Sequence, residues 1–119
     1  MEFNMKGLPD TNAKQFIAYN TTASGSDGVI TLAAPTDGSQ HVLDWIWWSY
    51  GAAPVTGGMT ISGMAATAEA ATTIATDITA AGTGQVLFGD RGLRAVVNTA
   101  VVITLLNGTA AKKLIVQYR

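Results

Sequence analysis

Residues 41–51, HVLDWIWWSYG, constrain the fold more than any other part of the chain, because they hold all three tryptophans. An apolar, aromatic run of this length between turn residues indicates a β-strand, whose side chains alternate between two faces. One face carries Val42, Asp44, Ile46, Trp48 and Tyr50, and the other carries His41, Leu43, Trp45, Trp47 and Ser49. Both faces are mostly apolar, which predicts a central strand covered on both sides.

Asp44 is the polar exception on the first of these faces. A carboxylate inside an apolar strand needs a partner, and we expect structural pairing with Arg91 or Arg94 in preference to catalysis. The face of Val42, Ile46, Trp48 and Tyr50 is predicted to fill the core, and a β-bulge near Asp44 would remove the carboxylate from it. The remaining apolar residues, Leu43, Trp45 and Trp47, are predicted to meet a second layer.

The rest of the chain is a train of short apolar runs separated by turn residues. Strands are predicted over 13–21, 29–34, 59–62, 70–79, 84–88, 100–106 and 113–119, with 93–97 extended but irregular. For the Ala- and Thr-rich part, a helix over 65–75 is the alternative to the strand at 70–79. The pair Asn107-Gly108 predicts a hairpin that joins 100–106 and 113–119 as neighbours in one sheet.

These spacings predict an all-β fold, a two-sheet β-sandwich of jelly-roll type with about eight strands. The 119 residues suit one domain. We place this domain at 13–119 and an extended N-terminal arm at 1–12, because Gly7 and Pro9 interrupt any helix there. Phe3, Met5 and Leu8 of the arm are expected to dock on an apolar surface, either of the same domain or of a neighbouring subunit.

Charged residues make up only 13% of the chain, and the net charge is −1. About 25% is usual for soluble domains, so either the protein is simply Ala- and Thr-rich or neighbouring subunits cover much of its surface. Lysines and arginines are scattered, which argues against a nucleic-acid partner. No apolar run is long enough for a transmembrane helix or resembles a signal peptide, so we expect no membrane partner and synthesis in the cytoplasm.

The residue types that carry catalysis and metal binding are sparse. The chain has one histidine, His41, and no cysteine, and its eight carboxylates are dispersed. His41 and Asp44 cannot share a strand face, because their separation is odd. Zinc requires three or four ligands, so we expect no metal, no cofactor and no catalytic residue.

Two segments, HVLDWIWWSYGAAPVTGGMTISG and LRAVVNTAVVITLLNGTAAKKLIVQYR, resemble the small jelly-roll proteins that decorate tailed-bacteriophage capsids, known as decoration or cement proteins. The resemblance spans residues 28–119. It rests on strand order, aromatic content, Asn98 before a buried run, and the apolar terminal strand. It implies a dimer or trimer on the outside of an icosahedral shell, clamping neighbouring major capsid proteins, and it carries over no catalytic residue.

A structural virion protein on the capsid surface is therefore the first functional hypothesis, and a tail, neck or fibre component is the second. The expected interaction residues are Phe3, Met5, Leu8, Trp45 and Trp47. A glycan-binding module is the third hypothesis, since Trp45 or Trp47 could stack on a sugar ring. Such sites usually add carboxylates and amides, which are sparse in this sequence.

Overall fold

The computed structural model describes residues 15–64 and 72–119, and every regular element in these ranges is a β-strand. Nine strands follow one another along the chain: β1 (Phe16–Thr22), β2 (Gly28–Leu32), β3 (Val42–Tyr50), β4 (Gly57–Ser62), β5 (Thr72–Ile78), β6 (Gly82–Leu87), β7 (Leu93–Arg94), β8 (Val101–Leu105) and β9 (Lys112–Tyr118). The predicted strand at 70–79 is present as β5. The predicted arm at 1–12, with Phe3, Met5 and Leu8, lies outside the described residues.

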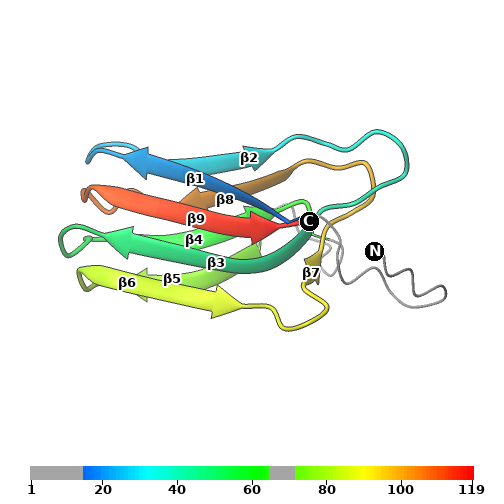
Figure 1. The fold of residues 1–119 in the computed structure, drawn as a ribbon. Helices are drawn as coiled ribbons and strands as arrows, with labels where there is room; N and C mark the ends of the chain where they lie inside the picture. Colours follow the sequence, from blue (N-terminus) through cyan, green and yellow to red (C-terminus); the bar gives the residue numbers. More distant parts are fainter. Residues whose placement is uncertain (1–14, 65–71) are drawn as a thin grey trace, which may run out of the picture.

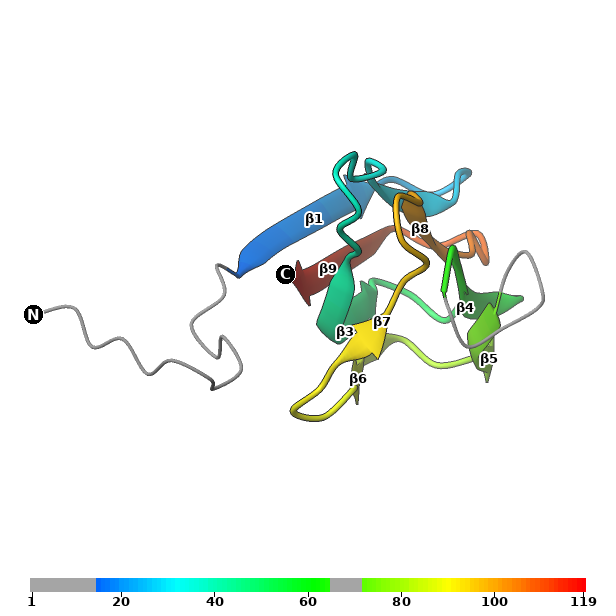
Figure 2. The ribbon, with the colours of Figure 1, turned by 90° about the vertical axis from the view of Figure 1, so that its right-hand side faces the viewer.

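The strands form two antiparallel sheets packed face to face, as Figures 1 and 2 show from two directions. The front sheet of Figure 1 has the order β1-β9-β3-β6, with the short β7 pairing with β3, and the back sheet has the order β2-β8-β4-β5. Successive strands alternate between the sheets from β1 to β4, and β4 and β5 then pair as neighbours in the back sheet. This strand order is that of a jelly roll. The predicted fold class is therefore confirmed.

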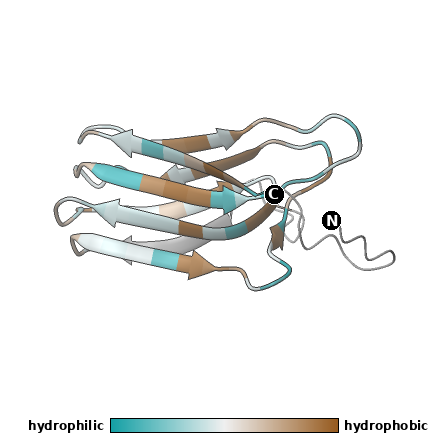
Figure 3. Cartoon of the chain, in the orientation of Figure 1, coloured by the Kyte–Doolittle hydropathy of each residue, from teal (hydrophilic) through white to brown (hydrophobic). Residues whose placement is uncertain are grey.

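The core lies between the sheets, and the buried side chains of the described residues are hydrophobic except for Lys112 at one end of the sandwich. Strand alternation explains its composition, because every second residue is buried in β2 and β8, and also in β9 as far as Val116. The front sheet contributes Leu43, Ile46, Tyr50, Leu114 and Val116, and the back sheet contributes Ile30, Leu32, Met59, Ile61, Val101, Ile103 and Leu105. Trp48 and Val86 pack against this cluster from the front sheet. Figure 3 shows the apolar segments recurring along strands of both sheets.

The hairpin predicted at Asn107-Gly108 is wrong, because β8 lies in the back sheet and β9 in the front sheet. The connection is instead a corner between the two layers. The Asn107 N–H donates to Asp27 Oδ1 at 2.8 Å, and Asn107 Oδ1 accepts from the N–H groups of Gly25 and Thr109 at 3.1 Å. Asn107 thus ties this corner to the β1–β2 connection, a role that a two-strand hairpin would not give it.

Candidate interaction surface

The bulge expected near Asp44 is confirmed and determines what each side of β3 presents. Leu43 is opposite Tyr118, and Trp45 is opposite Gln117, so Asp44 is the extra residue. Leu43 is therefore fully buried in the core. Its predicted place beside Trp45 and Trp47 is wrong, since the extra residue changes the alternation at this point. Trp48 packs against the core and lies on the opposite side from Trp45 and Trp47, as predicted.

The outer side of the front sheet carries two rows of side chains that cross four strands. The registers place Ile17, Gln117, Trp45 and Leu87 in one row, and Tyr19, Ile115, Trp47 and Gln85 in the next. Six of these eight side chains are aliphatic or aromatic. We call the six the outer apolar face: Ile17, Tyr19, Trp45, Trp47, Leu87 and Ile115.

This face is open to solvent, most of all along its edges. Tyr19 is 76% exposed, Leu87 66% and Ile17 61%, whereas Trp45 and Trp47 are half-buried between them. Contiguous exposed apolar patches on a soluble domain usually mark a binding surface. The sequence singled out Trp45 and Trp47, and it missed Ile17, Tyr19, Leu87 and Ile115. Alternation within residues 15–19 hinted at the first two, but only the pairing of β1 with β9 brings them beside the tryptophans.

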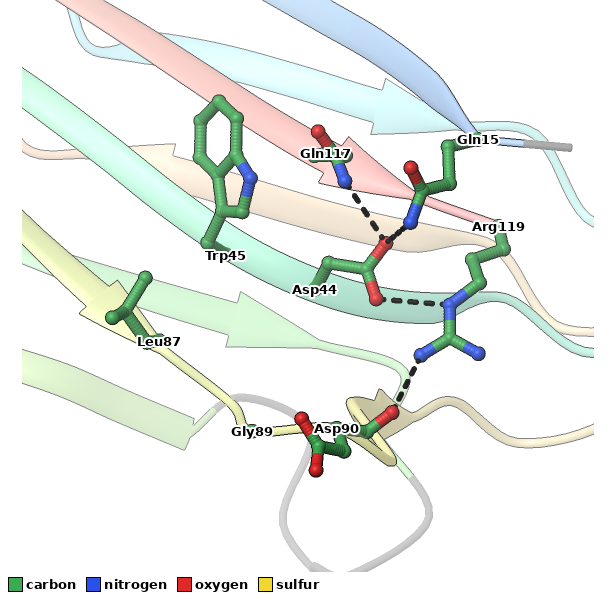
Figure 4. A pocket seen from close by; sticks show the side chains of 8 residues that line it. All are labelled: Gln15, Asp44, Trp45, Leu87, Gly89, Asp90, Gln117 and Arg119. Carbon is green, nitrogen blue, oxygen red and sulfur yellow. Dashed lines mark hydrogen bonds and ion pairs between the residues drawn. The ribbon is translucent and has the colours of Figure 1, made fainter. Parts of the chain in front are cut away.

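The outer apolar face ends in a polar pocket at the bulge (Figure 4). This Trp45 pocket has a volume of about 390 Å³, and its walls include Gln15, Asp44, Trp45, Asp90, Gln117 and Arg119. Asp44 Oδ1 accepts from Arg119 Nε at 2.9 Å, and Arg119 Nη2 donates to the Asp90 carbonyl at 3.1 Å. The predicted pairing of Asp44 with Arg91 or Arg94 is therefore wrong, because its arginine partner is Arg119, directly after β9.

The outer side of the back sheet is different in character. The registers align Thr31, Val102 and Ser62 in one row, and Val29, Thr104 and Thr60 in the next. These are short or β-branched side chains without an aromatic ring among them. Their hydroxyl groups leave this side more polar than the outer apolar face, so the two outer surfaces of the sandwich differ in what they can bind.

His41 has a structural environment. Its Nε2 lies 2.7 Å from the Ala33 carbonyl, and its ring meets Tyr118 edge-on with centroids 5.6 Å apart. In the described part of the chain, no three His, Cys, Asp or Glu side chains gather as potential metal ligands. Within residues 15–64 and 72–119, no helix is found that could span a membrane.

Two titratable side chains are buried at the end of the sandwich where β3 ends and β9 begins. Burial raises the pKa of the Tyr50 phenol, whose oxygen donates to the Leu106 carbonyl and accepts from the Gly58 N–H at 3.4 Å. Burial lowers the pKa of Lys112, whose ammonium group donates to the Ser26 carbonyl. Both face the interior and its rim, so neither belongs to the outer apolar face.

No protein-family model and no curated protein sequence matches the chain. Among solved structures, it is similar to a chain of the VLP of the extra small virus of the giant freshwater prawn Macrobrachium rosenbergii, with 9% identity, a TM-score of 0.34, and coverage of 99% of this chain and 82% of that chain. It is also similar to a chain of the capsid asymmetric unit of cyanophage Pam1, with 18% identity, a TM-score of 0.36, and coverage of 96% and 98%. Likeness at this level decides nothing about function, and the jelly roll is assigned from the strand order alone.

Proposed function

We propose that the protein is a structural virion protein, a decoration (cement) protein that binds the outside of a bacteriophage shell and bridges neighbouring major capsid proteins. The observation that carries the proposal is the β1 side of the outer apolar face. Ile17 and Tyr19 are among the most exposed large side chains, although each could have been replaced by a polar residue at no cost to the core. Exposure of this kind is typical of a surface that a partner covers.

β1 is also an edge strand, which favours a protein as the partner. It pairs with β9 on one side, and within the described residues no strand of the front sheet pairs with its other side. Its sequence, FIAYNTT, contains no charge and no proline, the features that usually protect a sheet edge. A protein subunit can pair with the backbone of such an edge strand and cover its apolar side chains.

The place of residues 1–14 in the sequence supports the proposal that the shell is the occupant. Residues 1–14 lead directly into β1, so a segment held by the shell would bring the β1 edge against the same partner. Phe3, Met5 and Leu8 would add apolar contacts, and Trp47 would border the interface. Because β1 carries no charge, burial of apolar area would supply most of the affinity of this strand. Association of the protein into dimers or trimers is the competing use of the same edge.

The proposal is tested by adding purified protein to phage shells that lack it and measuring bound copies by quantitative mass spectrometry. Wild-type protein should bind at a copy number comparable with that of the major capsid protein, and a few copies per particle would indicate a tail or neck component. Tyr19→Ser should weaken binding by about tenfold or more, the loss caused by removing ~1.4 kcal/mol of contact. Val29→Ser, on the outer side of the back sheet, is the matched control and should bind normally.

Removal of residues 1–9 should weaken binding as well, with the β-sheet circular dichroism spectrum unchanged. Light scattering measures the oligomeric state of each variant, and so distinguishes shell binding from self-association through the β1 edge. If Tyr19→Ser changes the oligomeric state and leaves shell binding intact, the outer apolar face joins copies of this chain and the proposed docking is wrong. Normal shell binding by both variants would equally contradict it.

A further inference from the structure

The Trp45 pocket differs from the rest of the outer apolar face in having polar walls. The bulge is the cause, because the extra residue places Asp44 and Trp45 outward one after the other. A carboxylate and an indole therefore lie side by side on a sheet surface, which regular alternation would prevent. Figure 4 shows the indole standing at one side of the pocket, with Asp44, Gln15, Gln117 and Arg119 at the other.

The polar groups of this pocket come from strands that are distant in the sequence. Gln15 precedes β1, and Asp90 lies in the loop after β6. Gln117 lies near the end of β9, and Arg119 directly follows this strand. The sequence showed only Asp44 next to Trp45, and the amides and the guanidinium group looked remote. Folding thus supplies the carboxylates and amides whose scarcity counted against a sugar site.

These groups retain hydrogen-bonding capacity. Among the described residues, Asp44 Oδ2 accepts two long hydrogen bonds, both at 3.5 Å, from the side-chain amides of Gln15 and Gln117. A carboxylate oxygen accepts bonds best at 2.7–2.9 Å, so a hydroxyl group could replace or supplement either contact. Among the described residues, the side-chain carbonyl oxygens of both glutamines have no partner, and neither has Arg119 Nη1.

We propose that the Trp45 pocket binds a neutral pyranose sugar, the terminal or an internal unit of an oligosaccharide. A pyranose ring presents C–H groups on its faces and hydroxyl groups around its rim. The half-buried indole of Trp45 can cover a C–H face with its accessible part. The rim hydroxyls can donate to Asp44 and the glutamine oxygens and accept from Arg119. The volume, about 390 Å³, lies within the ~300–1,000 Å³ typical of small-molecule sites.

The charges of the pocket select against acidic sugars. Its walls contain two carboxylates, Asp44 and Asp90, against one cation, Arg119, and the Arg119 guanidinium group is already bonded to Asp44 and to the Asp90 carbonyl. A phosphate or carboxylate on the ligand would meet net negative charge at close range. A flat protein surface could not reach the side-chain amides of Gln15 and Gln117 inside the pocket. A small polar ring could reach them, which favours a sugar over a protein subunit at this end of the outer apolar face.

The experiment is a titration of the isolated full-length chain, ¹⁵N-labelled, with neutral trisaccharides of glucose, mannose, galactose and N-acetylglucosamine. Three indole N–H resonances report separately on the three tryptophans, and Trp45→Phe assigns the first of them. At about 10 mM sugar, tenfold above a Kd of ~1 mM, at least one neutral trisaccharide should shift the Trp45 indole resonance near saturation. Its sulfated or carboxylated counterpart should bind at least about tenfold more weakly.

Trp45→Ala should abolish binding, and Asp44→Asn should weaken it, while thermal unfolding shows that both variants remain folded. Trp47→Ala is the matched control, since this tryptophan lies on the same strand and face but outside the pocket. It should keep the wild-type affinity within about twofold.

Binding that survives Trp45→Ala, or no shift with any neutral sugar, would overturn the assignment. A change in the Trp45 indole resonance that occurs only when phage shells are added would also overturn the assignment. It would indicate that a protein partner binds this end of the outer apolar face. Because no shell is needed for the titration, the absence of sugar binding would not contradict the proposed binding of β1 to the shell.

Discussion

Trp47 and Trp48 are adjacent in the sequence and face opposite sides of the front sheet. Trp48 lies between Leu114 and Gly84 in the register and packs against the core. Its indole lies so close to Gly84 that a β-carbon added there would be 2.3 Å from Trp48 Cζ2. Trp47 lies between Ile115 and Gln85 and borders a surface on which Tyr19 is 76% exposed.

The comparison shows that hydrophobicity alone does not say which tryptophan holds the fold together. What differs is the neighbourhood: a glycine makes room for one indole inside, and exposed side chains flank the other outside. The inner side of the sheet is optimised for packing, and the outer side is available for binding. Mutations on the two sides should therefore affect different measurements.

The largest difference is expected between alanine substitutions of the two adjacent tryptophans. Trp48→Ala should lower the free energy of unfolding by about 3–5 kcal/mol, because it empties space against the core. Trp47→Ala should lower it by less than about 1 kcal/mol, as is usual for a surface position. Urea denaturation followed by far-ultraviolet circular dichroism measures both. Equal destabilisation by the two substitutions would show that the outer side is also part of the folding core.

Gly84→Ala tests the inner side without changing a tryptophan. The added methyl group would collide with the Trp48 indole, and we expect a loss of about 1–3 kcal/mol of stability, the usual cost of overpacking. Gly51→Ala is the control, since a β-carbon there would meet nothing closer than the Ala111 carbonyl oxygen at 3.5 Å. If both variants unfold at the same urea concentration, the Trp48 indole does not depend on Gly84.

Tyr50→Phe removes one inner hydroxyl group and leaves the ring in place. Loss of the bond to the Leu106 carbonyl should cost about 1 kcal/mol at neutral pH. Because burial raises the pKa of Tyr50, the wild-type protein favours the neutral phenol. That stabilisation is fully present below the unfolded pKa of about 10 and is lost as pH rises through the higher folded value.

The difference in stability between wild type and Tyr50→Phe should therefore shrink as the pH rises above about 10, in a window that begins at the usual pKa of tyrosine and extends to the higher folded value. Urea denaturation at several pH values measures it. A difference that stays constant across this window would mean that the phenol titrates alike in the folded and unfolded chain.

Arg119→Gln should have the smallest effect on stability. The Arg119 and Asp44 side chains are 25% and 11% exposed, and an ion pair near solvent contributes less than about 1 kcal/mol. Adding salt should reduce the effect further. A loss as large as that of Gly84→Ala would assign the polar end of the outer face a structural role, in place of the binding role proposed for it.

Local pattern was sufficient to predict the strands and the facing of the tryptophans. β-branched and aromatic runs between glycine, proline and asparagine turns are read from short windows, and β2, β3, β8 and β9 lie where they were expected. The strand at 70–79, weighed against a helix over 65–75, was decided correctly by its β-branched residues. In each case the information needed lay within about ten neighbouring residues.

Contacts between distant segments could not be read in the same way. The pair Asn107-Gly108 marks a turn, but nothing nearby says whether the next strand stays in the same sheet. Arg119 pairs with Asp44 only because β9 lies beside β3, a register that local pattern does not encode. The outer apolar face and the Trp45 pocket depend on the same cross-strand alignment.

The bulge at Asp44 also has a consequence for insertions and deletions. On either side of it, Leu43 and Ile46 point inward and Trp45 points outward, and this is the order that a regular strand would show if Asp44 were absent. Loss of the Asp44 codon would thus preserve the inward and outward order of β3. It would remove an outward carboxylate and the backbone carbonyl that accepts from the Phe88 N–H at 3.1 Å. The gene can gain or lose this acidic group in one step without disturbing the interior, so the surface chemistry of the strand can evolve separately from its packing.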